Sequence, residues 1–162
     1  MPATFIVNAP GDAGAGSGLA GDIRFVINAA NALAGQDTII FDLAAIGGST
    51  ILMTNGELLI TDDLNISGPG AGLLTINPSN GTNSNRIFII AAATTVNISG
   101  LTLINGNGSA TFSATPGNQG GIIFSVGNLT ITDSVIRNGL VRGTDGINGT
   151  NVASPGDNGT AG

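Results

Sequence analysis

The stretch Leu64-Asn65-Ile66-Ser67-Gly68 decides the fold, because the chain repeats it twice further on. It returns as Val96-Asn97-Ile98-Ser99-Gly100 and again as Leu129-Thr130-Ile131-Thr132-Asp133, at spacings of 32 and 33 residues. Apolar and polar residues alternate within the copies, which is typical of a strand with one buried face. A period of this length indicates stacked structural repeats.

Two other short runs complete the repeat. Leu74-Thr75-Ile76-Asn77 is matched by Thr102-Leu103-Ile104-Asn105 and, after a one-residue shift, by Ser134-Val135-Ile136-Arg137-Asn138. Arg86-Ile87-Phe88-Ile89-Ile90 is matched by Gly121-Ile122-Ile123-Phe124, an alignment that pairs Phe88 with Phe124. Three short strands in every repeat predict a parallel β-helix, in which each coil lays its strands on those of the coil before it.

Stacking at a strand separation of about 4.8 Å places equivalent side chains directly over one another. Two aliphatic columns are expected inside the stack: Leu64/Val96/Leu129 and Ile66/Ile98/Ile131. Asn77, Asn105 and Asn138 fall in register at turns, where their amides can hydrogen-bond along the stack. Ligand binding is the alternative role for these Asn residues. The turn ladder is favoured because Asn tolerates the left-handed backbone geometry of corners.

The segment before the repeats reads differently. Thr4–Val7 is a short strand, and a Gly/Ala loop runs from it to Gly21. Asp22 is a suitable N-cap for an amphipathic helix from Asp22 to Ala34, which Gly35 ends. The apolar stripe of this helix contains Ile23, Val26, Ile27, Ala30 and Ala34. Three β-type runs follow it: Thr38–Phe41, Thr50–Met53 and Glu57–Ile60.

Composition excludes several kinds of chemistry. The 162 residues include no Cys, His, Lys, Trp or Tyr, so histidine- and cysteine-based zinc sites, Ser-His-Asp and Cys-His nucleophiles, disulfides and Schiff bases are absent. A net charge of −6 repels nucleic acids and anionic membranes. Only 9% of residues are charged, while Asn, Thr and Ser number 18, 17 and 11. This polar, uncharged surface suits a secreted or cell-surface protein.

Neither a targeting segment nor a membrane span is expected. Met1-Pro2-Ala3-Thr4 lacks a basic start and a long apolar stretch. The longest apolar run, Ile87–Ala93, is too short to cross a bilayer, so we expect a soluble chain without membrane insertion. Three alternatives stay open for export: a removed leader, a signal outside this segment, or a chain that is a fragment of something longer.

The order of these parts resembles a group of bacterial extracellular right-handed parallel β-helix proteins, found in adhesin-like and surface-anchored chains. The following stretches carry the resemblance, which covers roughly residues 4 to 140: Thr4–Asn8, Gly21–Arg24, Asn28–Asn31, Asp37–Asp42, Ile60–Gly70 and Gly127–Thr132. It implies an N-terminal cap, in which the helix Asp22 to Ala34 seals the first coil, and it implies no catalytic residues. Members of the group usually continue for many coils, whereas this chain is short.

We therefore predict an all-β fold, a right-handed parallel β-helix or solenoid of about three to four coils with an N-terminal capping α-helix. Residues 1–63 form the N-terminal strand, capping helix and first coil, and residues 64–140 form the remaining coils. Residues 141–162 form a Gly-rich polar tail without apolar periodicity.

An enzyme is not expected, although parallel β-helices also host polysaccharide lyases and hydrolases. Asp62 and Asp63 are the only adjacent acids, and Thr94-Thr95 stands at the equivalent place one coil later. A glycosidase needs two carboxyl groups about 5 to 9.5 Å apart across the sugar. Successive side chains of a strand point to opposite faces, so this pair does not suit that geometry. We predict no catalytic, cofactor-binding or metal site.

Three weaker candidates remain. Phe112 lies in a polar loop and is either an interaction residue or a packing anchor, and other aromatic platforms for sugars are few because Trp and Tyr are absent. Oxygen ligands for Ca²⁺ occur in the tail, at Asp145, Asn148, Asp157 and Asn158, but their spacing fits no calcium loop and favours a polar linker. The four Arg residues form no visible anion cluster: Arg24, Arg86, Arg137 and Arg142.

These observations predict a non-catalytic extracellular or cell-surface protein with a structural or adhesive role. We expect it to self-associate through the ends of the stack, and to be able to grow into a filament, because terminal strands expose unpaired backbone and apolar core. A fragment whose missing coils cover that end is the alternative to assembly. A polysaccharide-binding or polysaccharide-degrading module is the alternative function, and a glycan or cell-surface partner fits either role.

Overall fold

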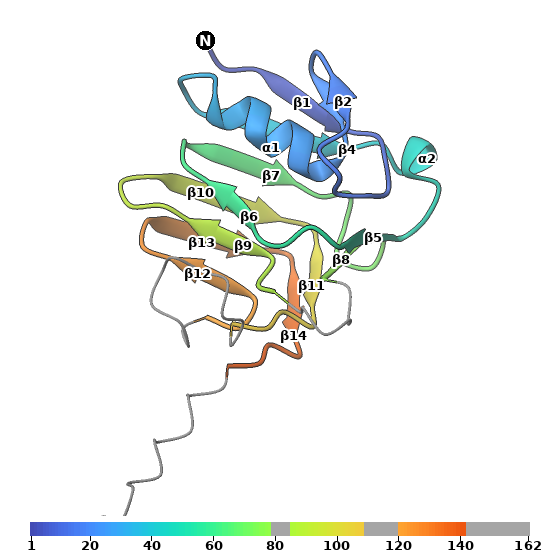
Figure 1. Ribbon diagram of the computed structural model, residues 1–162, viewed down its shortest axis with the longest axis vertical. Coiled ribbons are helices and arrows are strands. Elements are labelled where there is room, and N and C mark those ends of the chain that lie inside the picture. Colours follow the sequence, from blue (N-terminus) through green and yellow to red (C-terminus); the bar gives the residue numbers. More distant parts are fainter. Residues whose placement is uncertain (79–84, 109–119, 142–162) are drawn as a thin grey trace, which may run out of the picture.

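The computed structural model describes residues 1–78, 85–108 and 120–141, and the elements of this part of the chain are labelled in Figure 1. In chain order they are β1 (Thr4–Val7), β2 (Gly16–Ser17), β3 (Ala20–Gly21), α1 (Ile23–Asn31), β4 (Asp37–Phe41), α2 (Leu43–Ile46), β5 (Thr50–Met53), β6 (Leu58–Ile60), β7 (Leu64–Ser67), β8 (Thr75–Pro78), β9 (Phe88–Ile90), β10 (Thr95–Ser99), β11 (Thr102–Ile104), β12 (Ile123–Ser125), β13 (Asn128–Thr132) and β14 (Val135–Arg137).

The strands form three sheets that are parallel except at β2. The seven-stranded sheet has the order β13-β10-β7-β4-β1-β3-β2, the four-stranded sheet β14-β11-β8-β5, and the three-stranded sheet β12-β9-β6. From β4 onward the chain visits the three sheets in the same order, and we call each such passage a circuit. The circuits are β4-β5-β6, β7-β8-β9 and β10-β11-β12, and in the described part of the chain β13 and β14 follow them.

The predicted all-β class, a single right-handed parallel β-helix or solenoid, is wrong. The described residues form a mixed α/β structure, with two helices and three separate parallel sheets of unequal size. The repeat that begins at Leu64 does not describe the N-terminal part of the molecule. There α1 packs beside β6 and against β1, and β2 pairs antiparallel with β3. A helix thus supplies apolar surface that a regular repeat would supply with strands.

The register predicted for the repeated segments is confirmed. Val96 pairs with both Leu64 and Leu129, and Ile98 pairs with both Ile66 and Ile131. The predicted pairing of Phe88 with Phe124 is wrong, because Ile123 lies opposite Phe88 and Phe124 lies opposite Ile89. Phe124 instead lies beside Arg86, whose guanidinium carbon is 5.6 Å from the centre of the ring. Phe124 thus makes a cation–π contact with Arg86 and does not stack on Phe88.

Helix α1 begins where the sequence predicts. The carboxylate of Asp22 accepts a hydrogen bond from Phe25 N at 2.8 Å, as an N-cap does. The helix ends at Asn31 rather than at Ala34, because Ala34 is exposed and contributes nothing to the buried stripe. That stripe consists of Ile23, Val26, Ile27 and Ala30. Neither helix has the length and hydropathy that crossing a bilayer requires, within the residues described.

The Asn ladder is also confirmed. Asn105 Nδ2 donates to Asn77 Oδ1 at 3.1 Å, and Asn138 Nδ2 donates to Asn105 Oδ1 at 3.2 Å. Asn105 and Asn138 both have a φ of 59°, so each adopts the left-handed conformation expected of a corner residue.

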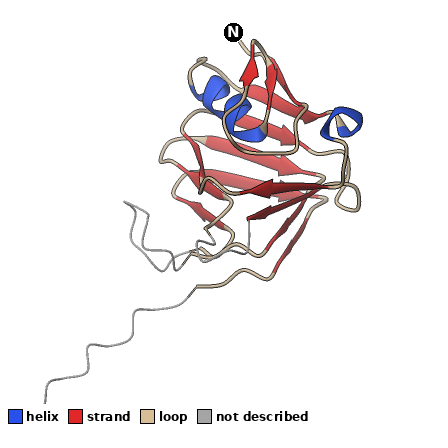
Figure 2. Ribbon diagram, turned by 45° about the vertical axis from the view of Figure 1, so that its right-hand side comes forward, coloured by secondary structure: helices blue, strands red, loops and turns tan. Residues whose placement is uncertain are grey.

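Figure 2 shows the two helices at the N-terminal end and the stacked strands below them. The two ends of the molecule are therefore built differently.

Candidate functional site

Within the described residues, the inward-facing columns end uncovered at the last circuit, β13-β14. Ile136 lies opposite Leu103 in the four-stranded sheet and so belongs to the same column. Leu103 has no exposed surface, whereas the exposed fraction of Ile136 is 45%. In the seven-stranded sheet, Ile98 is buried and its partner Ile131 is only partly buried. The last circuit thus presents side chains of core type to the surface.

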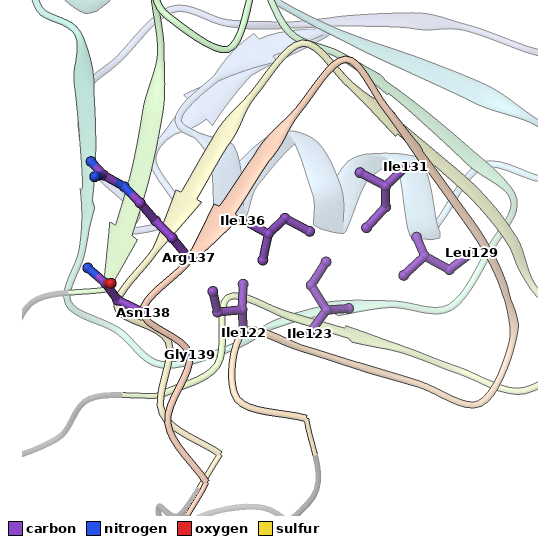
Figure 3. Close-up of a pocket in the computed structure, with 8 residues that line it drawn as sticks. All are labelled: Ile122, Ile123, Leu129, Ile131, Ile136, Arg137, Asn138 and Gly139. Atoms are coloured by element: carbon purple, nitrogen blue, oxygen red, sulfur yellow. The ribbon is translucent and has the colours of Figure 1, made fainter.

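These side chains surround a pocket of about 440 Å³. Figure 3 shows five aliphatic side chains converging on it from β13, β14 and the segment that includes β12, while Arg137 and Asn138 lie to one side. The converging residues are Ile122, Ile123, Leu129, Ile131 and Ile136. A hollow with this lining is the end of the hydrophobic core rather than a polar catalytic cleft. Its chemistry favours contact with another apolar surface.

Strand edges surround this pocket. Strands β13, β14 and β12 are each the terminal strand of their sheet, so within the described residues no further strand pairs with their outer sides. Figure 1 places them at the end of the molecule opposite α1. Further exposed apolar residues lie in the same region: Val126, Val135, Leu140 and Val141. We call this surface the open end, and such an edge is a template for further strand pairing.

The opposite end is closed by side chains that bond to strand edges. Arg24 donates from Nη1 to Glu57 O at 2.9 Å and from Nη2 to Gly56 O at 2.6 Å. Asn31 Nδ2 donates to Leu59 O at 2.8 Å, and Thr61 N donates to Asn31 Oδ1 at 2.9 Å. Helix α1 therefore satisfies the backbone along β6 in place of a neighbouring strand.

Asp12 closes the end of β5 in the same way. Its carboxylate accepts hydrogen bonds from Thr54 N at 2.8 Å and from Asn55 N at 3.0 Å, and it pairs with Arg24 Nη2 at 2.8 Å. Burial alone raises the pKa of Asp12, but the hydrogen bonds from Arg24, Thr54 and Asn55 outweigh it and hold the pKa below its ordinary value. The charged form of Asp12 is thus the one that seals this end.

Arg86 joins loops from successive circuits. The side chain is buried and donates from Nε to Gly120 O at 2.9 Å and from Nη2 to Gly108 O at 3.2 Å. Its Nη1 pairs with Glu57 Oε1 at 2.8 Å. Planar guanidinium geometry suits several simultaneous acceptors. These three contacts of Arg86 are structural, and they fix the corner that precedes the three-stranded sheet.

The acids that the sequence singled out are engaged in turns. Asp62 Oδ1 accepts a hydrogen bond from Asp63 N at 2.9 Å, and Asp63 Oδ1 accepts one from Thr95 N at 2.7 Å. The second contact joins one circuit to the next. Both carboxylates thus accept hydrogen bonds from backbone N–H groups, as carboxylates do in turns.

The other candidates are dispersed or fall outside the described residues. Arg24 and Arg86 have the backbone and carboxylate partners given above, while Arg137 lies at the rim of the open end. Phe112, Arg142 and the proposed oxygen ligands of the tail lie outside the residues that the structure describes: Asp145, Asn148, Asp157 and Asn158. Within the described ranges, no group of three acids is placed to hold a metal ion.

Sequence reasoning missed Asp12, Asn31 and Glu57. Each is a polar residue in or beside the N-terminal segment, where the repeat gives no alignment to predict a partner. Their contacts join residues 28 to 43 positions apart. The usable signal was Arg24, since a charged side chain on an apolar helix requires acceptors nearby.

Comparison with protein-family models, with curated proteins and with solved structures finds no match to this chain. The resemblance to bacterial extracellular proteins therefore stays a prediction from the sequence. The functional argument depends on the open end and on the surfaces of the sheets.

Proposed function

We propose that this protein is a non-catalytic structural or adhesive module that acts outside the cell or at its surface and self-associates through its open end. The exposure of Ile136 carries the proposal. This side chain occupies a core column, directly after the fully buried Leu103, yet it is 45% exposed. A second copy that covered it would complete the core.

Two kinds of interaction would stabilise association at this end: burial of apolar side chains and backbone hydrogen bonds. Complete burial of an aliphatic side chain contributes about 1.5–3 kcal/mol, so each half-exposed Val, Ile or Leu adds roughly half of that. The unpaired edges of β13, β14 and β12 add backbone hydrogen bonds. Few charges oppose the contact, because Asp133 and Arg137 are the ionisable residues between Ile122 and Val141, and their charges have opposite sign.

The structural role is supported by the engagement of polar groups in the stack. Asp63, Asp12 and Arg86 each bond to the backbone of a neighbouring segment. The extracellular assignment is supported by the sequence, in which Asn, Thr and Ser replace charged residues on the surface. Low charge and abundant Asn suit stacked turns.

The experiment is sedimentation velocity over a hundredfold range of protein concentration. The wild-type chain is expected to show a concentration-dependent shift to larger species. Ile136→Asn places a polar amide at the centre of the open end and is expected to raise the midpoint concentration of association at least tenfold. Leu73→Asn is the matched control, because Leu73 is 53% exposed and lies in the loop between β7 and β8. A wild-type chain that stays monomeric throughout would refute the proposal.

Polysaccharide binding is the second candidate function, and the outer face of the seven-stranded sheet favours it. One outward column contains only hydroxyl and amide side chains: Thr4, Thr38, Asn65, Asn97 and Thr130. Asn97 Nδ2 donates to Asn65 Oδ1 at 2.8 Å, which fixes the orientation of both amides. A regular, uncharged row of this kind suits a neutral glycan chain.

Binding to insoluble neutral polysaccharides tests this second function, with Thr38→Arg as the variant that places a charge within the row, between Thr4 and Asn65. Retention of the wild-type chain and loss of retention in Thr38→Arg would support it. A depolymerisation assay with the double variant Asp62→Ala/Asp63→Ala tests the degrading alternative. Turnover that this double variant abolishes would overturn the non-catalytic assignment.

A further inference from the structure

We infer that two copies meet open end to open end around a twofold axis and form a closed dimer rather than a filament. This inference rests on the proposed self-association and specifies its geometry. Joining two equivalent ends uses both of them, so the assembly stops at two chains. A filament requires that the open end of one copy pair with the N-terminal end of the next.

The N-terminal end is a poor partner for strand pairing. Along β6, the backbone groups Gly56 O, Glu57 O, Leu59 O and Thr61 N already bond to side chains of α1. At the end of β5, the N–H groups of Thr54 and Asn55 bond to Asp12. A strand arriving from another copy would have to displace these contacts, including the partly buried Asp12–Arg24 pair.

The seven-stranded sheet offers no better edge at that end. Its terminal strand there is β2, which consists only of Gly16 and Ser17. A two-residue strand forms few hydrogen bonds, and short edges of this kind limit edge-to-edge pairing. A Cβ at position 16 would lie 2.4 Å from the ring of Phe25, so this segment is also held tightly against α1. Strands β2 and β6 are therefore poor receiving strands for head-to-tail growth, and among the described strands at that end the outer side of β5 (Thr50–Met53) is the edge that remains.

The open end, in contrast, can pair with itself. Strand β13 is its longest edge, with five residues against three each in β12 and β14. Two identical edges related by a twofold axis run antiparallel, which is a fully hydrogen-bonded arrangement. Asn128, Thr130 and Thr132 face outward along β13 and are exposed, so pairing places polar groups outside and Leu129 and Ile131 toward the shared core.

The distribution of net charge favours contact between two open ends over contact between two N-terminal ends. Residues 1–63 contain seven acids and one Arg, a net charge of −6, whereas residues 64–141 contain Asp133, Arg86 and Arg137, a net charge of +1. Two N-terminal ends repel each other. Two open ends do not, and the dimer keeps the acidic ends as far apart as the molecule allows.

Single-cysteine variants test the geometry, because the chain contains no Cys. Asn128→Cys, Thr130→Cys and Thr132→Cys each place one thiol on the outward side of β13. A disulfide requires Cα atoms within about 7 Å, so at least one of the three is expected to give a disulfide dimer on a non-reducing gel after mild oxidation. Ser17→Cys is the control at the opposite end, and it is expected to stay monomeric under the same conditions.

The double variant Ser17→Cys/Thr130→Cys distinguishes the two assemblies. A ladder of trimers and larger species from this variant, with no dimer from the three single variants, would show head-to-tail growth and overturn the inference while leaving self-association intact. The absence of a dimer from every single variant, although the wild-type chain sediments as a dimer, would also overturn it. A monomeric wild-type chain would refute the proposed function itself.

Discussion

The carboxylate of Asp12 lies 2.8 Å from the guanidinium of Arg24, and the two side chains share the task of closing the N-terminal end. Asp12 satisfies N–H groups that follow β5, while Arg24 satisfies carbonyl groups that precede β6. One ion pair therefore ties the edges of two sheets to the first turn of α1.

Acid is expected to destabilise the fold through Asp12. Its pKa in the folded protein is below the ordinary value of 3.8, so its contribution is fully present above about pH 4 and is lost as the pH falls through the folded pKa. Urea unfolding at pH 7, 4 and 3 measures the effect. Asp12→Asn removes the titration, and the free-energy difference between wild type and this variant is expected to shrink below pH 4. A difference that stays constant would contradict the prediction.

Arg86 is expected to contribute more to the free energy of unfolding than an exposed ion pair does, because it is buried and bonds to Glu57, Gly108 and Gly120. Arg86→Met leaves two carbonyl groups and a largely buried carboxylate without this donor, at a cost of about 3 kcal/mol in the free energy of unfolding. Adding Glu57→Gln is expected to recover part of that loss, which a double-mutant cycle in urea measures. Additive effects of the two changes would contradict a direct coupling.

Ile98→Asp is expected to unfold the middle circuit, because Ile98 is buried between Ile66 and Ile131 and the new carboxylate would have no partner. The loss should exceed about 4 kcal/mol, the scale of a buried unpaired charge. Ser99→Asp is the neighbouring control on the opposite face of β10. Thermal melting followed by circular dichroism checks both variants, and a near-wild-type melting temperature for Ile98→Asp would show that this column is not core.

The Asn ladder gives a graded prediction at position 105. Asn105→Ala removes the amide that bonds to Asn77 and Asn138, and it leaves a non-glycine residue at a φ of 59°. We expect a loss of about 2 kcal/mol, combining a hydrogen bond with backbone strain. Asn105→Gly removes the same amide but relieves the strain, so it should cost less. Equal losses from the two variants would mean that φ at this position contributes nothing.

The part of the fold that follows Leu64 was predictable, because alternation and a constant period together fix which residues stack. Val96 over Leu64 and Asn105 over Asn77 follow from that alignment alone. The predicted pairing of Phe88 with Phe124 was wrong because the alignment of these two runs was displaced by one residue. Sequence similarity of two Phe residues gave no information about the cation–π contact that Phe124 makes with Arg86.

The overall class was not predictable in the same way. The helix and its N-cap at Asp22 were read correctly, but a local pattern says nothing about how α1 and the antiparallel β2–β3 pair combine with separate sheets. An uncovered end was predictable, because residues 141–162 have no apolar periodicity from which to build a cap. The closing side chains of the other end were not, because the contact of Asp12 with Asn55 spans 43 residues and no periodicity relates the two.

Asn138 donates to Asn105, and Asn105 donates to Asn77, so both side-chain amides donate in the same direction, from the open end toward the N-terminal end. The row thus has a polarity: Asn138 Nδ2 is engaged, and within the described residues no further Asn of this row donates to its side-chain oxygen. A further circuit bearing an Asn at the matching position would continue the series without reorienting any amide already in place. Chain length in this architecture can therefore change in whole circuits, through duplication or deletion of one period, while α1 and its contacts remain as they are.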